Sequence, residues 1–404
     1  MFLETLLVIF IAFVLGLIAG SITGLAPGIH INLIAALLLA SLSTFNTVPP
    51  LALVIFIVVM SLTHTLLDFI PTIFLGVPEE ESFLALLPGH QLLKEGRGYE
   101  ALVLMIIGAL IGLVILIFAA PLYILGLPVF YPLLKEALPF VLIALSIYLV
   151  ARDDSPLKAL FVFALSGLLG LLTFNLPVKE PLMPLLTGLF GCSALLLASP
   201  SSAPKQKQVI SPLAQLVPSK REIVPASCAA LIAAPLCSFL PGIGSGHAAT
   251  LGSEIIPQNN RSFLMLIGAI NVLVMSLSFV TVYAIGRARS GSAAAVQNIL
   301  QTISITDIMT ILLFITLTLL ITTPLALFIA ARAAKLFNKV NYVMFSRVVL
   351  VILAVLTLVF SNFLGFIILA AGTFIGIFCI QNGTRRIHLM AALILPTIVF
   401  YLVH

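Results

Sequence analysis

Two short breaks interrupt otherwise hydrophobic stretches, LAPGIHIN at residues 25–32 and FLPGIGSGH at residues 239–247. Proline ends an incoming helix, and glycine allows a ligand to approach the backbone closely. The free N–H groups of a helix that starts after such a break favour an anion, and Ser, Asn and His side chains can donate to its oxygens. Alternatively, Ser245 and Asn32 only cap the new helices. The residues of the breaks that we expect to bind substrate are Pro27, Gly28, His30, Asn32, Pro241, Gly242, Gly244, Ser245 and His247.

Other polar side chains lie inside predicted membrane spans, where they are costly and are therefore functional candidates. His64 and Asp68 are four residues apart, on one face of a predicted helix. They either couple transport to a proton or cation, or form an internal pair that holds helices together. His64 suits proton coupling because histidine titrates near neutral pH. Asn271, in LIGAINVLVMS, either faces the site or joins helices.

The segment GVPEEES of the first half occupies the place of GRARSGS in the second. Glu79 and Glu80 are candidates for ion coupling, although acids in a first helical turn also simply complement the helix dipole. Arg287, Arg289 and Ser290 are candidates for an anion clamp or entry funnel. The two arginines could otherwise anchor the chain at lipid headgroups.

The composition is that of a polytopic membrane protein. Of the 404 residues, 61% are hydrophobic and 8% are charged, whereas soluble domains carry about 25% charged residues. The net charge of +5 is too small to indicate nucleic-acid binding, and the four cysteines have no CxxC spacing. With no Walker loop and no zinc cluster, we expect neither ATP hydrolysis nor a metal site. The only expected cofactor is a coupling ion, Na⁺ or H⁺.

Apolar runs of membrane-spanning length follow one another along the chain. They lie near residues 4–20, 28–44, 50–75, 98–119, 131–151, 157–174, 182–199, 224–240, 243–256, 262–285, 311–331, 341–360, 363–380 and 386–403. The sequence therefore predicts an all-α fold.

The motif Pro-Gly-Ile occurs once in each half, which indicates a duplication. We predict a first repeat at 1–199 with its hairpin at 4–44, a polar linker at 200–222, and a second repeat at 223–404 with its hairpin at 224–256. Each repeat is a hairpin with a Pro-Gly tip plus about five transmembrane helices. Whether the hairpin arms are re-entrant or full spans stays open.

The placement of basic residues predicts the topology. If each hairpin returns to the side it entered from, each half crosses the membrane an odd number of times and the repeats are inverted. Fifteen Lys and Arg residues then lie on the side of the linker, and four, Lys135, Lys179, Arg287 and Arg289, lie on the other. Because basic residues accumulate in cytoplasmic loops, we expect a multi-pass cell-membrane protein with a cytoplasmic linker and both termini outside.

Several segments resemble a known family. FLGVPEEESFLALLPGHQLLKEGRGYEAL, the tips LAPGIH and LPGIGSG, and Asn271 with IGRARSGSAAAV are similar to motifs of the tripartite tricarboxylate transporter large-permease family. The chain looks closest to a short, uncharacterised prokaryotic branch of that superfamily. The resemblance implies a permease with inverted halves that moves carboxylates together with a cation. It also implies a small membrane subunit and a periplasmic binding protein as partners.

These observations predict a secondary active transporter of an organic carboxylate, driven by H⁺ or Na⁺, and not an enzyme. Helix N-termini also suit a phosphate, so a flippase for a polyprenyl-phosphate lipid is the alternative. An intramembrane enzyme built on His64 and Asp68 is a third class. Expected partners are a small anion or a lipid phosphate, membrane lipids and, as one assembly, a homodimer.

Overall fold

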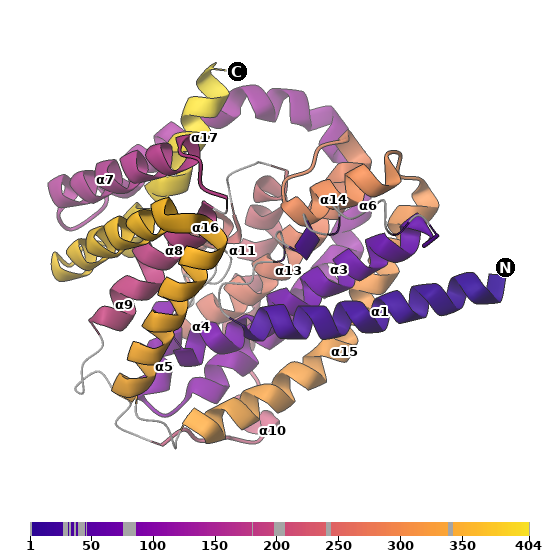
Figure 1. Ribbon diagram of the computed structural model, residues 1–404, viewed down its shortest axis with the longest axis horizontal. Coiled ribbons are helices and arrows are strands. Elements are labelled where there is room, and N and C mark those ends of the chain that lie inside the picture. The colour runs from indigo at the N-terminus through magenta and orange to yellow at the C-terminus, as the bar shows by residue number, and fades with distance from the viewer. Residues whose placement is uncertain are drawn as a thin grey trace. The chain divides into compact units, whose positions relative to one another are not determined.

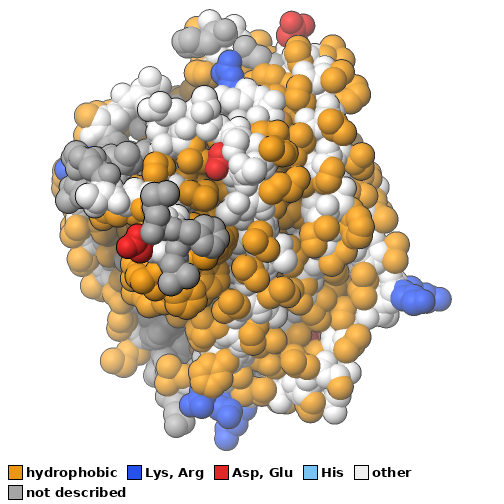
Figure 2. Space-filling model, turned by 90° about the vertical axis from the view of Figure 1, so that its right-hand side faces the viewer, with side chains coloured by type: hydrophobic (Ala, Val, Ile, Leu, Met, Phe, Trp, Pro, Cys, Tyr) orange, Lys and Arg blue, Asp and Glu red, His pale blue; other side chains and the backbone are white. Residues whose placement is uncertain are grey.

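The protein is all-α in the computed structural model, which describes every residue except 1, 27–30, 32–33, 36–37, 39–44, 46, 76–85, 180, 198–206, 240–243, 338–341 and 404. Within this part of the chain, eight helices are long and apolar enough to cross a membrane. Figure 2 shows a face covered mostly by hydrophobic side chains, with few charged ones. The prediction of an all-α polytopic membrane protein is confirmed.

The chain forms two compact units, and each combines segments of both sequence halves. Unit 1 comprises Met1–Phe74, Leu84–Val129 and Lys205–Lys339, and unit 2 comprises Leu75–Phe83, Phe130–Pro204 and Val340–His404. Each compact unit therefore contains parts of both predicted repeats. The repeats themselves stay a prediction.

The helices of unit 1, apart from α12, are labelled in Figure 1. They are α1 (Phe2–Leu25), α3 (Pro50–Leu67), α4 (Phe69–Leu75), α5 (Leu86–Lys94), the first part of α6 (Gly98–Ala151), α10 (Leu213–Leu216), α11 (Lys220–Cys237), α12 (Ser245–Ile255), α13 (Asn260–Ile285), α14 (Gly291–Leu300) and α15 (Ile305–Phe337). Those of unit 2 are the rest of α6, α7 (Pro156–Asn175), α8 (Leu182–Leu186), the π-helix η3 (Thr187–Cys192), α9 (Ser193–Leu196), α16 (Tyr342–Gln381), the 3₁₀-helix η5 (Arg386–Met390) and α17 (Ala391–Val403).

Helices α1 and α3 pack closely and run parallel. Three glycines four residues apart on α1 lie against backbone oxygens with the same spacing on α3, because a glycine has no Cβ to keep the helices apart. The pairs are Gly16 with Phe56, Gly20 with Met60 and Gly24 with His64, and an added Cβ would lie 2.5–2.9 Å from these oxygens. The two helices therefore run in the same direction.

The first helix of the second half also runs parallel to the helix that follows its hairpin. Near its start, Glu222 of α11 pairs with Arg261 of α13, and at its end Ser238 contacts Thr281 of α13. Helix α12 lies between them in sequence and packs on both. With 11 residues α12 is about 16 Å long, so this helix is too short to cross a bilayer core of about 30 Å.

Helices α6 and α13 cross at small residues in unit 1. The closest approaches are Gly108 to the Met265 oxygen, Gly268 to the Met105 oxygen and Gly112 to the Ala269 oxygen. The sequence predicts two spans, 98–119 and 131–151, but α6 is continuous over both. Its prolines each remove one backbone hydrogen bond without ending the helix, which is common in membrane helices.

Unit 2 is held together by similar contacts between small residues. Gly170 of α7 lies against the Ala392 oxygen of α17, and Gly188 of η3 lies against the Leu369 oxygen of α16. Helix α16 is interrupted at Asn362, which has a positive φ of 63°. This interruption agrees with the two apolar runs 341–360 and 363–380 of the sequence.

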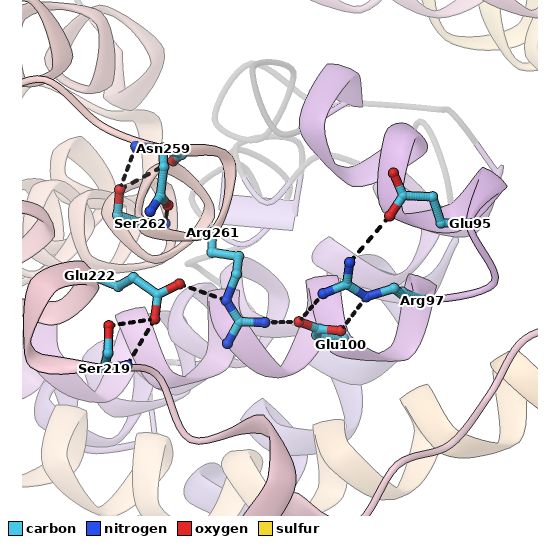
Figure 3. Close-up of polar contacts among 8 residues, drawn as sticks. All are labelled: Glu95, Arg97, Glu100, Ser219, Glu222, Asn259, Arg261 and Ser262. Carbon is cyan, nitrogen blue, oxygen red and sulfur yellow. Dashed lines mark hydrogen bonds and ion pairs between the residues drawn. The ribbon is translucent and has the colours of Figure 1, made fainter.

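A cluster of charges joins three helix starts at one end of unit 1 (Figure 3). Arg261 at the start of α13 pairs with Glu100 of α6 and, at 2.7 Å, with Glu222 of α11. Arg97 donates to Glu100 at 2.7 Å from Nε. Both acids lie in the first turn of their helices, where they complement the helix dipole. The cluster therefore holds the starts of α6, α11 and α13 in register.

Candidate functional site

The candidate site is centred on the start of α14. Helix α13 ends at Gly286, whose φ of 62° turns the chain back. Ser290 then caps α14 by accepting a hydrogen bond from the N–H of Ala293, 3.2 Å away. The hydroxyl of Ser290 is 3.5 Å from that of Ser278 on α13. Helix α14 therefore begins beside α13, two turns before α13 ends.

A second contact fixes the start of α14 against α3. Ser292 is fully buried, and its Oγ accepts a hydrogen bond of 3.1 Å from Ser61. Ser61 is the twelfth residue of α3, close to the middle of that span. Helices α3, α13 and α14 pack on one another (Figure 1). The N-terminal end of α14 thus lies inside unit 1, with its dipole positive end in the interior.

The two arginines of GRARSGS have different environments. Arg287 is exposed, whereas Arg289 is half-buried with its Nη1 shielded from solvent. The Arg289 guanidinium is close enough to Tyr123 and Cys237 to interact with them electrostatically. Since Cys237 ends α11, the Arg289 guanidinium lies near the end of this helix. Of the two arginines, Arg289 is the one whose side chain lies partly inside unit 1.

Tyr123 of α6 is a site residue that sequence reasoning missed. Its hydroxyl is 2.7 Å from that of Ser238, just beyond α11, and 2.9 Å from that of Thr281 on α13. Tyr123 thereby connects α6 to α13 and to the residue that follows α11. The available signal in the sequence was a tyrosine inside the apolar run PLYILGLP, because a tyrosine hydroxyl needs a hydrogen-bond partner when it is buried.

We expect Tyr123→Phe to lower the free energy of unfolding by about 1–3 kcal/mol, because it removes a buried hydroxyl from two partners. The melting temperature of the purified protein measures this. Tyr148→Phe is the matched control: its hydroxyl contacts Arg152 at the exposed end of α6 and should matter less. Equal melting temperatures for the two variants would contradict the role assigned to Tyr123.

The start of α12 agrees with the predicted helix after the second break. The carbonyl of Gly244 accepts a hydrogen bond from Ala248, 3.3 Å away, and Ser245 is 1% exposed. A second buried helix N-terminus therefore exists in unit 1. Several predicted residues lie outside the described ones: Pro27, Gly28, His30, Asn32, Glu79, Glu80, Pro241, Gly242 and the side chain of His247.

Asn271 lies in the middle of α13 and is 1% exposed. Neither its Nδ2 nor its Oδ1 has a hydrogen-bond partner in the described part of the chain. It lies seven residues before Ser278, and therefore on the same helix face. The structure thus gives no support to the alternative that Asn271 joins helices.

His64 and Asp68 are both buried, at 3% and 4% exposure. The His64 Nδ1 is 3.0 Å from the hydroxyl of Thr23 on α1, so this histidine does connect two helices. The next turn of α3 toward its start carries Ser61, which reaches α14. Among the described residues, no group of three His, Cys, Asp or Glu side chains could hold a metal ion.

Unit 2 holds a separate buried pair, Asp153 and His388, joined at 2.8 Å. Burial alone would raise the pKa of Asp153, but hydrogen bonds from Ser155, His388 and the backbone of Arg385 hold the pKa of this carboxyl below its usual value. The carboxylate is therefore charged at neutral pH. It joins the turn between α6 and α7 to the start of η5. Nothing in the sequence indicates this pairing, because the two residues are 235 positions apart.

Comparison with known proteins places the chain in a family. Residues 10–391 match the family described as "Tripartite tricarboxylate transporter TctA family". The chain is 31% identical over 403 residues to "Uncharacterized protein MJ1079" of Methanocaldococcus jannaschii, covering 96% of this chain and 98% of that protein. No solved structure matches the chain. The protein therefore belongs to the tripartite tricarboxylate transporter TctA family, a family of carboxylate transporters.

Proposed function

We propose that the chain is a secondary active transporter that binds its carboxylate in unit 1, where α12 and α14 begin. The observation that carries the proposal is the buried start of α14, which lies against α3 and α13 next to Arg289. A buried carboxylate needs charged and hydrogen-bonding partners. Two helix N-termini and one guanidinium supply both.

The packing of unit 1 supports the proposed inverted repeats. By chain order, α1 corresponds to α11, α3 to α13, and α6 to α15. Helix α1 packs on α3, and α11 packs on α13; α3 packs on α15, and α13 packs on α6. Exchanging the two halves leaves this pattern unchanged, as a pseudo-twofold axis requires. Inverted repeats around a midplane site are a common basis of alternating access.

The directions of the helices support the proposed topology. Helices α6, α11 and α13 all begin at the charge cluster of Figure 3. Gln208, in the linker, donates to the Leu93 oxygen at the same end. Helix α4 ends there too, since Phe74 lies next to Gly98. A cytoplasmic linker therefore puts these ends inside and the starts of α1 and α3 outside.

For coupling, we propose the region of His64 and Asp68. These residues lie on the helix that also carries Ser61, so an ion bound there could influence the start of α14. Both H⁺ and Na⁺ are compatible with a histidine, a carboxylate and neighbouring hydroxyls. Glu79 and Glu80 remain sequence-based candidates for the same role.

The family name implies partner subunits in general. We propose that a periplasmic binding protein delivers the substrate and that a small membrane subunit accompanies this chain, as expected from the sequence. A homodimer also stays a prediction.

Thermal stability of the purified protein against a ligand panel tests this function. The panel contains di- and tricarboxylates, inorganic phosphate and a short-chain polyprenyl phosphate, each with and without Na⁺ at two pH values. A ligand at 100 times its Kd adds about 2.7 kcal/mol to the stability. Stabilisation by a carboxylate that grows with Na⁺ or acid is expected. Stabilisation by the lipid phosphate alone would contradict the proposal and favour the flippase.

A further inference from the structure

The buried amide of Asn271 carries information about the substrate. Its Nδ2 is a donor and its Oδ1 an acceptor, and both lack partners in the described part of the chain. A buried polar atom without a partner is costly and rare in native proteins. The amide therefore indicates a ligand that brings both an acceptor and a donor.

Asn271 also lies at the depth expected for a transported ligand. It is the twelfth of the 26 residues of α13, about 17 Å from the helix start and therefore near the middle of the hydrocarbon core. Its helix face is shared with Ser278, which contacts the cap of α14. The interface of α13 with α6 is made by Met265, Gly268 and Ala269. Gly268 is one turn before Asn271, so Asn271 lies at the edge of this interface, on the face that carries Ser278.

We propose that the substrate is a hydroxycarboxylate and that Asn271 recognises its hydroxyl; this rests on the carboxylate-binding function proposed above. The substrate hydroxyl donates to Oδ1, and a substrate oxygen accepts from Nδ2. A carboxylate alone has only acceptors at neutral pH and leaves Oδ1 unpaired. An ammonium group could also donate, but it would add positive charge to an interior that already holds Arg289.

L-Malate and succinate are the matched probes, because they differ only in one hydroxyl. We expect wild-type protein to bind malate about 10- to 100-fold more tightly than succinate, since a site built for a hydroxyl rejects a ligand that lacks it. Equilibrium binding of each to the purified full chain measures the ratio. L-Aspartate, which carries an ammonium group in place of the hydroxyl, should bind more weakly than malate.

Asn271→Leu should reduce the malate-to-succinate ratio to about one. The unliganded variant should melt at the same or a higher temperature, because an apolar group replaces an amide without partners. Thr357→Val is the matched control: its hydroxyl is also buried and without a hydrogen-bond partner among the described residues, but it lies in unit 2. This control should keep the wild-type ratio.

The outcomes separate the inference from the function on which it rests. Equal binding of malate and succinate by wild type, or a ratio that survives Asn271→Leu, would overturn the role of Asn271 while leaving carboxylate binding intact. Tighter binding of aspartate than malate would overturn the choice of a hydroxyl. If no carboxylate binds wild-type protein, the proposed function itself fails.

Discussion

Arg289→Gln should weaken carboxylate binding about 10- to 100-fold while leaving the protein folded. The guanidinium is the half-buried positive charge that lies next to Tyr123 and the end of α11. A hydrogen bond to a charged group contributes about 1.5–3 kcal/mol, and about 1.4 kcal/mol corresponds to a factor of ten in affinity. Isothermal titration calorimetry of purified protein with malate measures the change, and the melting temperature shows whether the variant is folded.

Arg287→Gln is the matched control for this variant. Arg287 lies two residues earlier in the same segment, but its side chain is exposed, and a charge in contact with water contributes little to affinity at ordinary ionic strength. Its affinity should stay within about twofold of wild type. Equal losses in the two variants would show that both arginines act by general attraction, and would contradict a specific contact from Arg289.

Gly108→Val should cost about 3 kcal/mol or more of stability and sharply reduce the yield of folded protein. A Cβ at Gly108 would lie 2.0 Å from the Met265 oxygen, so α6 and α13 would have to separate. Overpacking of a tight interface usually costs 1–3 kcal/mol, and more when the backbone must move. The amount of monodisperse protein after extraction and its melting temperature measure the effect.

Val114→Leu tests whether this cost comes from the interface. Val114 is on α6 close to Gly108 in sequence, but it is 54% exposed on the outer surface of the helix. The added methylene should change the melting temperature little. A similar loss in both variants would indicate that α6 tolerates no change anywhere, and that the crossing with α13 has no special role.

The sequence predicted the long apolar helices well, because helix length and hydrophobicity are local properties. A helix is predicted at 243–256 after the second break, and the structure has α12 at Ser245–Ile255. The continuity of α6 through 98–151 was missed, because proline and glycine between two apolar runs usually indicate a turn. Its prolines are instead accommodated within one helix.

The site was less accessible to sequence reasoning because its contacts are long-range. That His64 and Asp68 share a helix follows from their spacing, but nothing in the sequence indicates that Thr23 contacts His64. Likewise, Arg287 and Arg289 are two residues apart and chemically identical, and only the structure shows that they differ in burial. Such differences depend on the turn at Gly286, whose left-handed conformation directs the following residues back toward α13.

The two sequence halves did not predict how the chain divides into compact units. The linker rich in Ser, Pro and Lys indicates two inverted repeats, at 1–199 and 223–404. In the fold, each unit instead combines the earlier segments or the later segments of both halves. Such exchange arises when each half buries its small-residue faces against the other half, as α7 does against α17.

The central claim, carboxylate transport through the site at Arg289, is tested most directly by exchange of labelled L-malate across proteoliposomes that contain the purified chain. Millimolar malate on both sides replaces delivery by a binding protein. We expect rapid exchange with wild type and Arg287→Gln, and little with Arg289→Gln. Equal exchange with all three proteins, or no exchange of malate with wild type, would contradict the account.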